Sequence, residues 1–535
     1  MFCFRKISAA ATTACSITLF ASALSAPTPV YALTGLELES ALESDSSLSN
    51  EAKAVYAARG YQPIWIGSGN LERAKALLGA LDQAVNHGLP TARYQQDLLD
   101  VALQNLTGPD AAAAEILATR IYLQYAQDLT SGALEPKAID KEIAVRPPRR
   151  PGDRLLAAVA EAPPEAFFKA LAPRNAEYAA LLAEKKHLEA KLDEEVGPQL
   201  TRQTVRQGSS GDQVIALRLR LTALGYGELG TADVFDPDLR TVVRQFQRDR
   251  GLSADGIVGR GTLRALGRQV SVKDKLQSVV VALERERWLN RDRGHRHIIV
   301  NIADYSFNLY ENDKPVFHSI AVVGKNTSDR RTPEFHDEMT HMVVNPTWHV
   351  PPSIAGKEYL PTLKKNGGLR GMRVISRTGK VVEPGSVDFT QYTAKNFPFS
   401  VKQPPGPRNA LGRVKFMFPN KFNIYLHDTP KKSLFQREVR AFSHGCIRVE
   451  RPFEFAHELL SKQTANPEAA FEAFLNTGRE QYVNLQVPVP VYLTYKTAFV
   501  GQDGAMAYTD DMYGRDKKIY AALVDAGLVT PTPGS

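Results

Sequence analysis

The sequence predicts a multidomain α+β protein with a helical N-terminal region, a small three-helix domain and a β-rich C-terminal domain. Its 535 residues exceed the roughly 250 to 300 residues at which a single hydrophobic core stops growing, so several domains are expected. Apolar residues recur every three or four positions in the N-terminal half, whereas runs of β-branched and aromatic residues follow residue 295. With 43% hydrophobic and 23% charged residues, the chain can bury sizeable cores.

Residues 1–32 have the pattern of a secretory signal peptide. Arg5 and Lys6 precede a moderately apolar run over 7–24, and small residues that suit cleavage follow. A retained membrane anchor is the alternative, but Thr and Ser dilute the run, which is short for a span of roughly 20 residues. A lipoprotein is not favoured either, because no apolar residue stands just ahead of Cys15. We therefore expect export without stable membrane insertion after cleavage.

The positive charge of the chain carries little information about partners. The formal charge is +8, but no Lys/Arg block exceeds short stretches such as Arg146 to Arg150. A charge spread so thinly is typical of a solvated basic surface. We expect no nucleic-acid partner.

Residues 33–200 are predicted to form a helical scaffold domain. Apolar side chains recur at spacings of three and four from Ala111 to Leu129, and Pro-rich loops such as 146–152 break the pattern. The stretch shows neither an acid–base pair nor a metal-ligand spacing. We expect it to support the other domains.

Residues 203–268 form a compact unit of three short predicted helices. A Gly-rich turn at 208–211 opens the first helix, the second follows Asp236-Pro237, and the third covers about 261–266. The unit resembles the peptidoglycan-binding domain of cell-wall enzymes, whose pattern is matched by Gly211, Phe246-Gln247, Gly251-Leu252 and Asp255-Gly256. A helical spacer that binds nothing is the alternative.

A linker helix is expected within 269–294, and a β-rich domain within 295–535. The turn at 311–314 predicts a hairpin between the first strands, and 485–500 is expected to pair with 505–508 across 501–504. The strands are predicted at 297–302, 307–310, 316–323, 339–344 and 422–427.

Residues 351–404 interrupt the strand pattern with several Pro residues and the pairs Lys364-Lys365 and Gly367-Gly368. A long excursion within a compact β domain is often an active-site lid, so we predict a capping insertion. A surface insertion without catalytic consequence is the alternative.

Cys446 is the one cysteine left once Cys3 and Cys15 are removed with the signal peptide, so no disulfide can form within the mature chain. An unpaired thiol in an oxidising compartment is a candidate reactive centre. A buried inert thiol is the alternative, because free cysteines are among the most buried residues.

Two histidines lie close to Cys446 in the sequence pattern. A thiol with a pKa of roughly 8.5 needs a nearby base to become a nucleophile at neutral pH. His427, at the end of a predicted strand, is the favoured base, and we expect it to form an ionised pair with the sulfur. His444 is the rival, but a residue two positions away in a tight turn can be held off the sulfur.

The remaining candidates surround this pair. Gly445 suggests a turn whose backbone N–H groups could hold an oxyanion, and Tyr425 could add a hydroxyl donor. Arg448 either pairs with a substrate carboxylate or braces the turn. Ser443 is a second turn residue whose role the sequence leaves open.

Together these residues resemble the L,D-transpeptidase catalytic domain of the YkuD type. Its signature is a His followed some fifteen residues later by Ser/Thr-His-Gly-Cys, an apolar residue and Arg or Asn. Here Ser443 follows His427 by 16 positions. The stretch from Gly406-Pro407 through Asn409 to Gly412 resembles the Gly-Pro-x-Asn-x-Leu-Gly segment ahead of the catalytic strands.

The length and order of domains resemble the large Gram-negative, YcbB-like branch of that family. Asp428 departs from the commonest pattern, because many members carry Gly after the His, and this puts local backbone freedom in doubt. By this resemblance, Trp348, Tyr425, Asn409 and Gly412 are expected to contact substrate. The supporting segments are 61–65, 87–90, 345–348 and 510–516.

The resemblance implies a reaction at the cell wall. Cys446 would attack the carbonyl between the third residue and D-Ala of a tetrapeptide stem, release D-Ala, and pass the acyl group from a thioester to a neighbouring amine, giving a 3-3 cross-link. Carbapenems would acylate the same sulfur. The expected location is the periplasm and the expected partners are peptidoglycan stem peptides and glycan, with cell-wall synthases as further partners.

No cofactor or metal is expected, since the eleven His residues show no HExxH or paired Cys/His spacing. Two alternatives to the transpeptidase reaction stay open. An L,D-carboxypeptidase or lipoprotein-attaching enzyme would use the same residues with another acceptor. A non-catalytic wall-binding protein would not need Cys446 at all.

Overall fold

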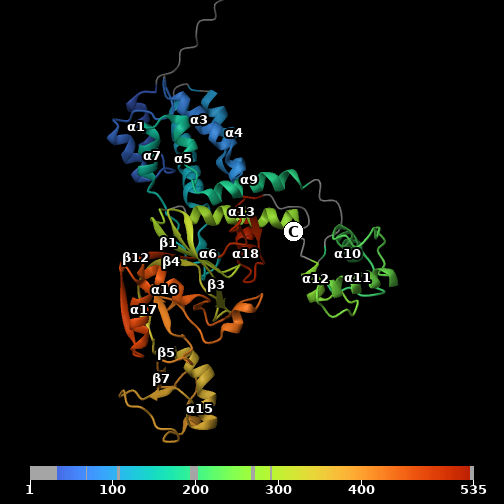
Figure 1. The fold of residues 1–535 in the computed structure, drawn as a ribbon. Coiled ribbons are helices and arrows are strands. Elements are labelled where there is room, and N and C mark those ends of the chain that lie inside the picture. Colours follow the sequence, from blue (N-terminus) through green and yellow to red (C-terminus); the bar gives the residue numbers. More distant parts are fainter. Residues whose placement is uncertain are drawn as a thin grey trace, which may run out of the picture.

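The computed structural model describes residues 33–67, 69–104, 106, 109–192, 200, 203–266, 271–289 and 292–529. A helical N-terminal part, a three-helix unit set to one side, and a β-rich part with an insertion at its far end follow one another (Figure 1). The predicted multidomain α+β fold is confirmed. No helix within these ranges is long and apolar enough to cross a bilayer. The predicted signal peptide lies outside the described residues.

The scaffold is built around α5 (Pro109–Ser131), the helix that the apolar periodicity predicted. Its buried Glu115 accepts hydrogen bonds from the backbone N–H groups of Ile64, Trp65 and Ile66 and so holds the preceding loop against the helix. The surrounding helices are α1 (Gly35–Ser44), α2 (Asn50–Ala58), α3 (Leu71–Asp82), η1 (Ala84–His87), η2 (Thr91–Tyr94), α4 (Gln96–Gln104), α6 (Pro136–Ile139), α7 (Gly152–Glu161), α8 (Pro164–Lys169) and α9 (Ala176–Ala190).

Helix α13 (Val272–Trp288) was expected to be a linker, but it runs through the contact between the scaffold and the β-rich domain (Figure 1). Every residue from Val279 to Trp288 is buried. The helix touches α5 and α9 on one side and α18 (Arg515–Asp525) on the other. A helical segment that is buried all round belongs to a core, so the second half of α13 joins the two domains.

The three predicted short helices of the side unit are present as α10 (Asp212–Ala223), α11 (Pro237–Asp249) and α12 (Arg260–Ala265). Asp236 caps α11 by accepting from the N–H of Leu239, and Pro237 occupies the first turn, where its missing N–H costs nothing. The small core includes Val214, Leu217, Leu221 and Phe246.

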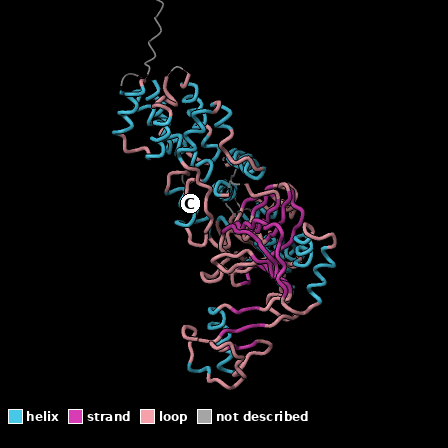
Figure 2. The backbone as a smooth tube through the Cα atoms, turned by 90° about the vertical axis from the view of Figure 1, so that its left-hand side faces the viewer, coloured by secondary structure: helices cyan, strands magenta, loops and turns pink. Residues whose placement is uncertain are grey.

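The β-rich domain is a closed sheet. Its strand order is β10-β3-β11-β9-β8-β4-β12-β1-β2, and β2 pairs back onto β3. Figure 2 shows the strands gathered at the centre of this domain. The strands are β1 (Arg296–Asn301), β2 (Ser306–Glu311), β3 (Lys314–Gly324), β4 (Phe335–Val344), β8 (Val414–Met417), β9 (Leu426–His427), β10 (Ala441–Ser443), β11 (Ile447–Val449) and β12 (Gln481–Thr494), with η5 (Lys432–Gln436), α16 (Pro452–Leu460) and α17 (Pro467–Asn476) beside them.

Several strand predictions are confirmed and two are not. The hairpin at 311–314 is present, with Glu311 opposite Lys314. The strand predicted at 422–427 is reduced to Leu426–His427, because the Asn420 side chain accepts from the N–H groups of Phe422 and Ile424 and closes a turn instead. Only β13 (Ala498–Val500) pairs with β14 (Met506–Tyr508), since β12 lies between β1 and β4.

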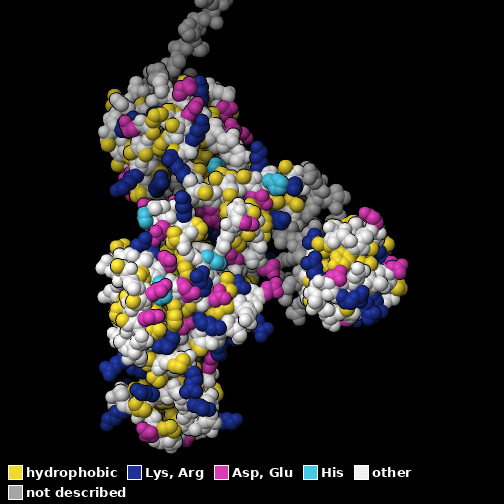
Figure 3. All heavy atoms as spheres, in the orientation of Figure 1, with side chains coloured by type: hydrophobic (Ala, Val, Ile, Leu, Met, Phe, Trp, Pro, Cys, Tyr) yellow, Lys and Arg dark blue, Asp and Glu magenta, His cyan; other side chains and the backbone are white. Residues whose placement is uncertain are grey.

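The insertion, called the cap below, extends from β5 (Trp348–Val350) to β7 (Ser400–Gln403), the two strands that lead to and from it (Figure 2). It has a core of its own around Leu363. Residues 351–404 include nine Lys and Arg but only three Asp and Glu. Basic side chains are visible over the surface of this end of the molecule (Figure 3). The other cap elements are α14 (Pro352–Ile354), η3 (Ala355–Tyr359), α15 (Leu360–Asn366), β6 (Arg373–Ile375) and η4 (Phe389–Gln391).

Candidate active site

The strand register brings the predicted nucleophile and base to one face of the sheet. His427 on β9 lies opposite Arg448 on β11 and opposite Lys415 on β8, so the three side chains form a row. Cys446 and Tyr425 each stand two residues earlier, just ahead of β11 and β9, so extended backbone places them in the next row on the same face. Strand spacing puts the Cα atoms of Cys446 and His427 about 8 Å apart, a span that the two side chains can bridge.

His427 is buried, with 4% of its surface exposed. Its Nδ1 is hydrogen-bonded to the backbone oxygen of Asp428, which can only accept, so Nδ1 carries the proton and Nε2 is left as an acceptor. Burial and then the positive charge of Arg448 lower the pKa of His427 to about 3. The imidazole is therefore neutral at physiological pH and can accept a proton.

Cys446 is half-buried, and its Sγ lies 3.5 Å from the backbone oxygen of Asn423. Burial raises the pKa of the thiol to about 11, against the lowering influence of Tyr425, Arg448 and Lys415. The expected ionised pair is therefore not the favoured form, because this environment disfavours charge on both groups. The thiol and the imidazole both favour their neutral forms, so proton transfer has to accompany attack.

The turn before Cys446 is stabilised by hydrogen bonds of Ser443 within the turn and by one from Thr332 outside it. Ser443 Oγ donates to the backbone oxygen of Cys446 at 2.5 Å and accepts from the N–H of Gly445 at 3.1 Å. The N–H of Gly445 itself is therefore already used, and the oxyanion role expected of the N–H groups in this turn stays a prediction. Gly445 has a φ of +114°, which favours glycine, and its oxygen accepts from Thr332 Oγ1 at 2.7 Å. The N–H of Cys446 and the Tyr425 hydroxyl are the remaining candidate donors.

Tyr425 and Trp348 line the site from the strand and from the base of the cap. The Tyr425 side chain interacts with the Cys446 sulfur and with Trp348, and burial raises its pKa well above the usual value. Its ring centroid lies 5.7 Å from that of His427. Trp348 in turn meets Tyr359 of the cap at 6.1 Å between ring centroids. Tyr425 is therefore adjacent to Cys446, and Trp348 is adjacent to Tyr425.

His444 points toward the cap, not into the row of the base. Its Nε2 lies 2.6 Å from Glu358 Oε1 on η3, and Arg330 donates to the same oxygen at 2.7 Å. Lys357 on the same turn pairs with Asp329 at 2.9 Å. These contacts, called the cap latch below, join the cap to the segment that carries Cys446. They favour His427 over His444 as the base.

Asn409 and Gly412 are both buried and shape the backbone around the site. The Asn409 amide donates to Pro346, Gln403 and Pro404 oxygens and so clamps the base of the cap. A Cβ on Gly412, whose φ is +64°, would lie 2.2 Å from Asp428 Oδ2. The direct substrate contacts expected of these two residues stay a prediction.

Asp428 stands where many members of the family carry Gly, and its carboxylate holds the surrounding backbone. Its carboxylate accepts from the N–H groups of Arg413 and Thr429 and pairs with Lys432 at 2.8 Å. It does not have a positive φ. The residue therefore needs no glycine-like freedom, and it fixes the backbone oxygen that orients His427.

Sequence reasoning missed two charged residues of the site. Lys415 alternates with buried apolar residues in Val414-Lys415-Phe416, a signal for an outward-facing strand position that could have drawn attention to it. Glu358 carries no comparable signal, because its contact with His444 spans 86 positions of sequence.

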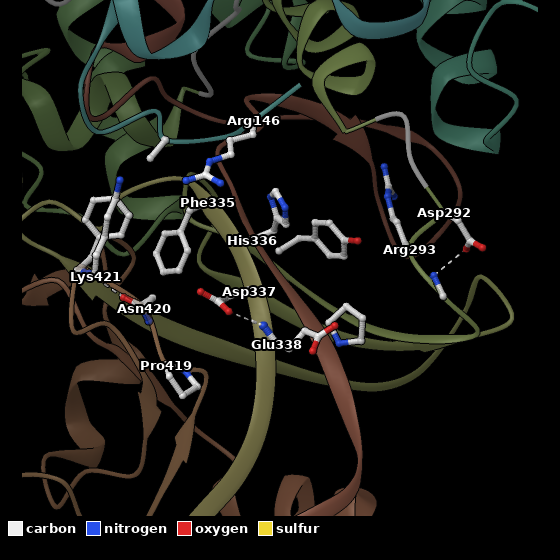
Figure 4. A pocket seen from close by; sticks show the side chains of 15 residues that line it. Arg146, Asp292, Arg293, Phe335, His336, Asp337, Glu338, Pro419, Asn420 and Lys421 are labelled. Carbon is white, nitrogen blue, oxygen red and sulfur yellow. Dashed lines mark hydrogen bonds between the residues drawn. The ribbon is translucent and has the colours of Figure 1, made fainter. Parts of the chain in front are cut away.

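A separate pocket of about 700 Å³ lies between the scaffold loop at Ala144 and Arg146, the segment after α13, and β4 and β12 (Figure 4). Arg293, His336 and Lys421 are among the residues that line it. Cys446 and His427 are not, so the pocket is distinct from the site described above.

Three family models match separate stretches of the chain. Residues 50–184 match a scaffold domain, residues 210–266 a peptidoglycan-binding domain, and residues 295–471 the L,D-transpeptidase catalytic domain called YkuD. The last stretch contains both Cys446 and His427. The three matches follow the order of the domains described above.

Individual relatives are similar over part of the chain. A protein of Haemophilus influenzae named "Putative L,D-transpeptidase" is 34% identical over 238 residues, which are 44% of this chain and 47% of that relative. The chain thus spans about half the length of the curated relative it matches.

Among solved structures, an L,D-transpeptidase of Xylanimonas cellulosilytica has 16% identity over 55% of this chain and 98% of its own, with a TM-score of 0.15. One of Stackebrandtia nassauensis has 12% identity over 56% and 97%, with a TM-score of 0.17. From the family matches, the chain contains an L,D-transpeptidase catalytic domain of the YkuD family beside a scaffold domain and a peptidoglycan-binding domain.

Proposed function

We propose that the protein is a periplasmic peptidoglycan L,D-transpeptidase that forms 3-3 cross-links through a thioester on Cys446. The observation that supports this proposal is that a neutral His427 lies on β9 while Cys446 immediately precedes the neighbouring strand β11, within the stretch that matches the catalytic domain. Assignment to the large Gram-negative, YcbB-like branch, and cell-wall synthases as partners, are parts of the same proposal.

In the first half-reaction the Cys446 thiol gives its proton to His427 Nε2 as the sulfur attacks the carbonyl of the third stem residue. The N–H of Cys446 and the Tyr425 hydroxyl stabilise the oxyanion. The C–N bond to D-Ala then breaks, and the amine of D-Ala takes the proton from the imidazolium as it leaves. A thioester and a neutral His427 remain.

In the second half-reaction an amine of a neighbouring stem attacks the thioester. His427 accepts a proton from the attacking amine and returns it to the sulfur as the C–S bond breaks. The product is an amide cross-link and the free thiol is restored. Water in place of the amine would give the L,D-carboxypeptidase product instead.

The test is incubation of the full chain with a disaccharide tetrapeptide, followed by intact mass, peptide mapping and product analysis. We expect release of D-Ala, an acyl adduct on Cys446 that is absent from Cys446→Ala, and a dimer whose fragmentation shows the 3-3 link. Release of D-Ala without a dimer would indicate a carboxypeptidase. A carbapenem adduct on another residue would overturn the site, and no reaction at all would favour a wall-binding protein.

We further propose that the cap orders the donor stem and excludes water from the thioester. The cap latch supports this, because Glu358 joins the cap to His444, two residues before the nucleophile. Its ion pair with Arg330 is partly exposed, so each contact alone is modest.

Glu358→Gln is expected to raise the ratio of hydrolysis to cross-linking about threefold to tenfold, because the weakened latch opens the cap more often. The ratio is measured by mass spectrometry of the two products. Glu383→Gln, a change at an exposed residue elsewhere on the cap, is the matched control and should leave the ratio unchanged. An unaltered ratio in Glu358→Gln would show that the latch does not govern water access.

A further inference from the structure

Lys415 is a half-buried cation near His427 and Tyr425, and no residue that the structure describes forms an ion pair with it. It lies opposite His427, and its Nζ is 5.9 Å from the ring centroid of Tyr425. Burial lowers its pKa, and Glu480 is the carboxylate that acts on it through space. Glu480 accepts from the N–H of Thr347, and within the described ranges Lys415 has neither a salt bridge nor a side-chain hydrogen bond.

Arg448 completes the arrangement on the other side of the base. It is half-buried, and its Nε has no hydrogen-bond partner among the described residues. Two cations therefore flank His427, one on each neighbouring strand. Withdrawing unpaired charges from water costs free energy, so such a pair is stabilised when an anion arrives.

We propose that Lys415 is a specificity-determining residue that binds a carboxylate of the donor stem peptide. This inference rests on the proposed function, which supplies a substrate with a carboxylate at its D-Ala terminus and others along the stem. Arg448 lies on β11, directly after Cys446 and Ile447. Lys415 lies on β8, two strands from β11, so the two backbones are about 10 Å apart. A carboxylate held there orients a stem that crosses β9 above His427.

A carboxylate bound at Lys415 would also favour proton transfer from Cys446 to His427. Lys415 and Arg448 both disfavour a positive charge on His427. A carboxylate bound at Lys415 neutralises one of these charges at the moment when the imidazole must accept the thiol proton. Substrate binding and activation of the nucleophile are thereby coupled.

The test compares Lys415→Met with the wild type on matched donors: the free acid, the donor amidated at the D-Ala terminus, and the donor amidated at the side-chain carboxylate of the third residue. We expect the wild type to prefer the free acid over one of the amides by at least about tenfold in kcat/KM, since a charge-assisted contact is lost. The amide that loses activity identifies the carboxylate. In Lys415→Met this preference should fall to near unity, with most of the change in KM, whereas Lys415→Arg should keep it.

The preference ratio is the decisive readout, because a change in folding or base strength lowers both rates together. Lys421→Met, an exposed change in the turn before β9, is the matched control and should keep the wild-type ratio. The same ratio in Lys415→Met as in the wild type overturns the inference. If the wild type releases no D-Ala from any donor, the proposed function itself fails.

Discussion

Replacing His427 with alanine is expected to lower kcat for D-Ala release by about 10² to 10⁴, the range over which a general base acts. The thiol has a pKa of about 11 and is almost wholly protonated at pH 7, so attack requires an acceptor for its proton. His427 Nε2 is the acceptor that the neighbouring strand offers. Single-turnover acylation, followed by intact mass, measures this step apart from cross-linking.

His444→Gln is the matched comparison. The amide can still reach Glu358, and the side chain lies on the cap side of the turn, so we expect a loss of about tenfold or less. A larger loss in His444→Gln than in His427→Ala would reverse the assignment of the base.

Alkylation of Cys446 by iodoacetamide adds a test of the charge state. With a thiol pKa of about 11, the rate should rise about tenfold per pH unit between pH 7 and 9. A thiolate–imidazolium pair formed before attack would instead give a rate that hardly changes over this range.

The sequence pointed to those residues of the candidate site that belong to a known signature or lie close together along the chain. His427 lies on β9 and Cys446 just ahead of β11, and the buried residues Leu426 and Ile447 are paired across these two strands. The charge state of His427 was not predictable, because it depends on burial, on the charge of Arg448 and, less, on that of Lys415 from a third strand.

The fold was predictable where periodicity is strong and local. Helix α5 and the hairpin at 311–314 follow from their own residues. The segment 422–425 does not, because the side chain of Asn420 competes with strand pairing by bonding the backbone two and four residues on. The burial of the second half of α13 was not predictable either. Residues 284–287 are all charged, and their partners lie in other domains or on the same helix.

The buried ion pairs of α13 lead to the second prediction with a large expected effect, a loss of stability. Arg285 on α13 pairs with Glu334 and, at 2.8 Å, with Asp516 of α18, and its side chain is 3% exposed. Arg515 also contacts Glu334 and donates to the oxygen of Thr332, whose hydroxyl holds the Gly445 oxygen. A buried network thus links the scaffold side of the molecule to the turn that carries Cys446.

Arg285→Met is expected to cost about 3 to 5 kcal/mol, because it leaves Glu334 and Asp516 buried with fewer compensating charges. Urea unfolding followed by tryptophan fluorescence measures the transition that includes this interface, because Trp288, one of three Trp residues, has its ring centroid 6.0 Å from the Arg285 guanidinium. Lys518→Met on α18 removes a partly exposed pair with Asp140 and should cost about 1 kcal/mol or less. Equal shifts in the two variants would show that the buried network does not stabilise the junction, and an unchanged rate of Cys446 acylation in Arg285→Met would separate that junction from the catalytic turn.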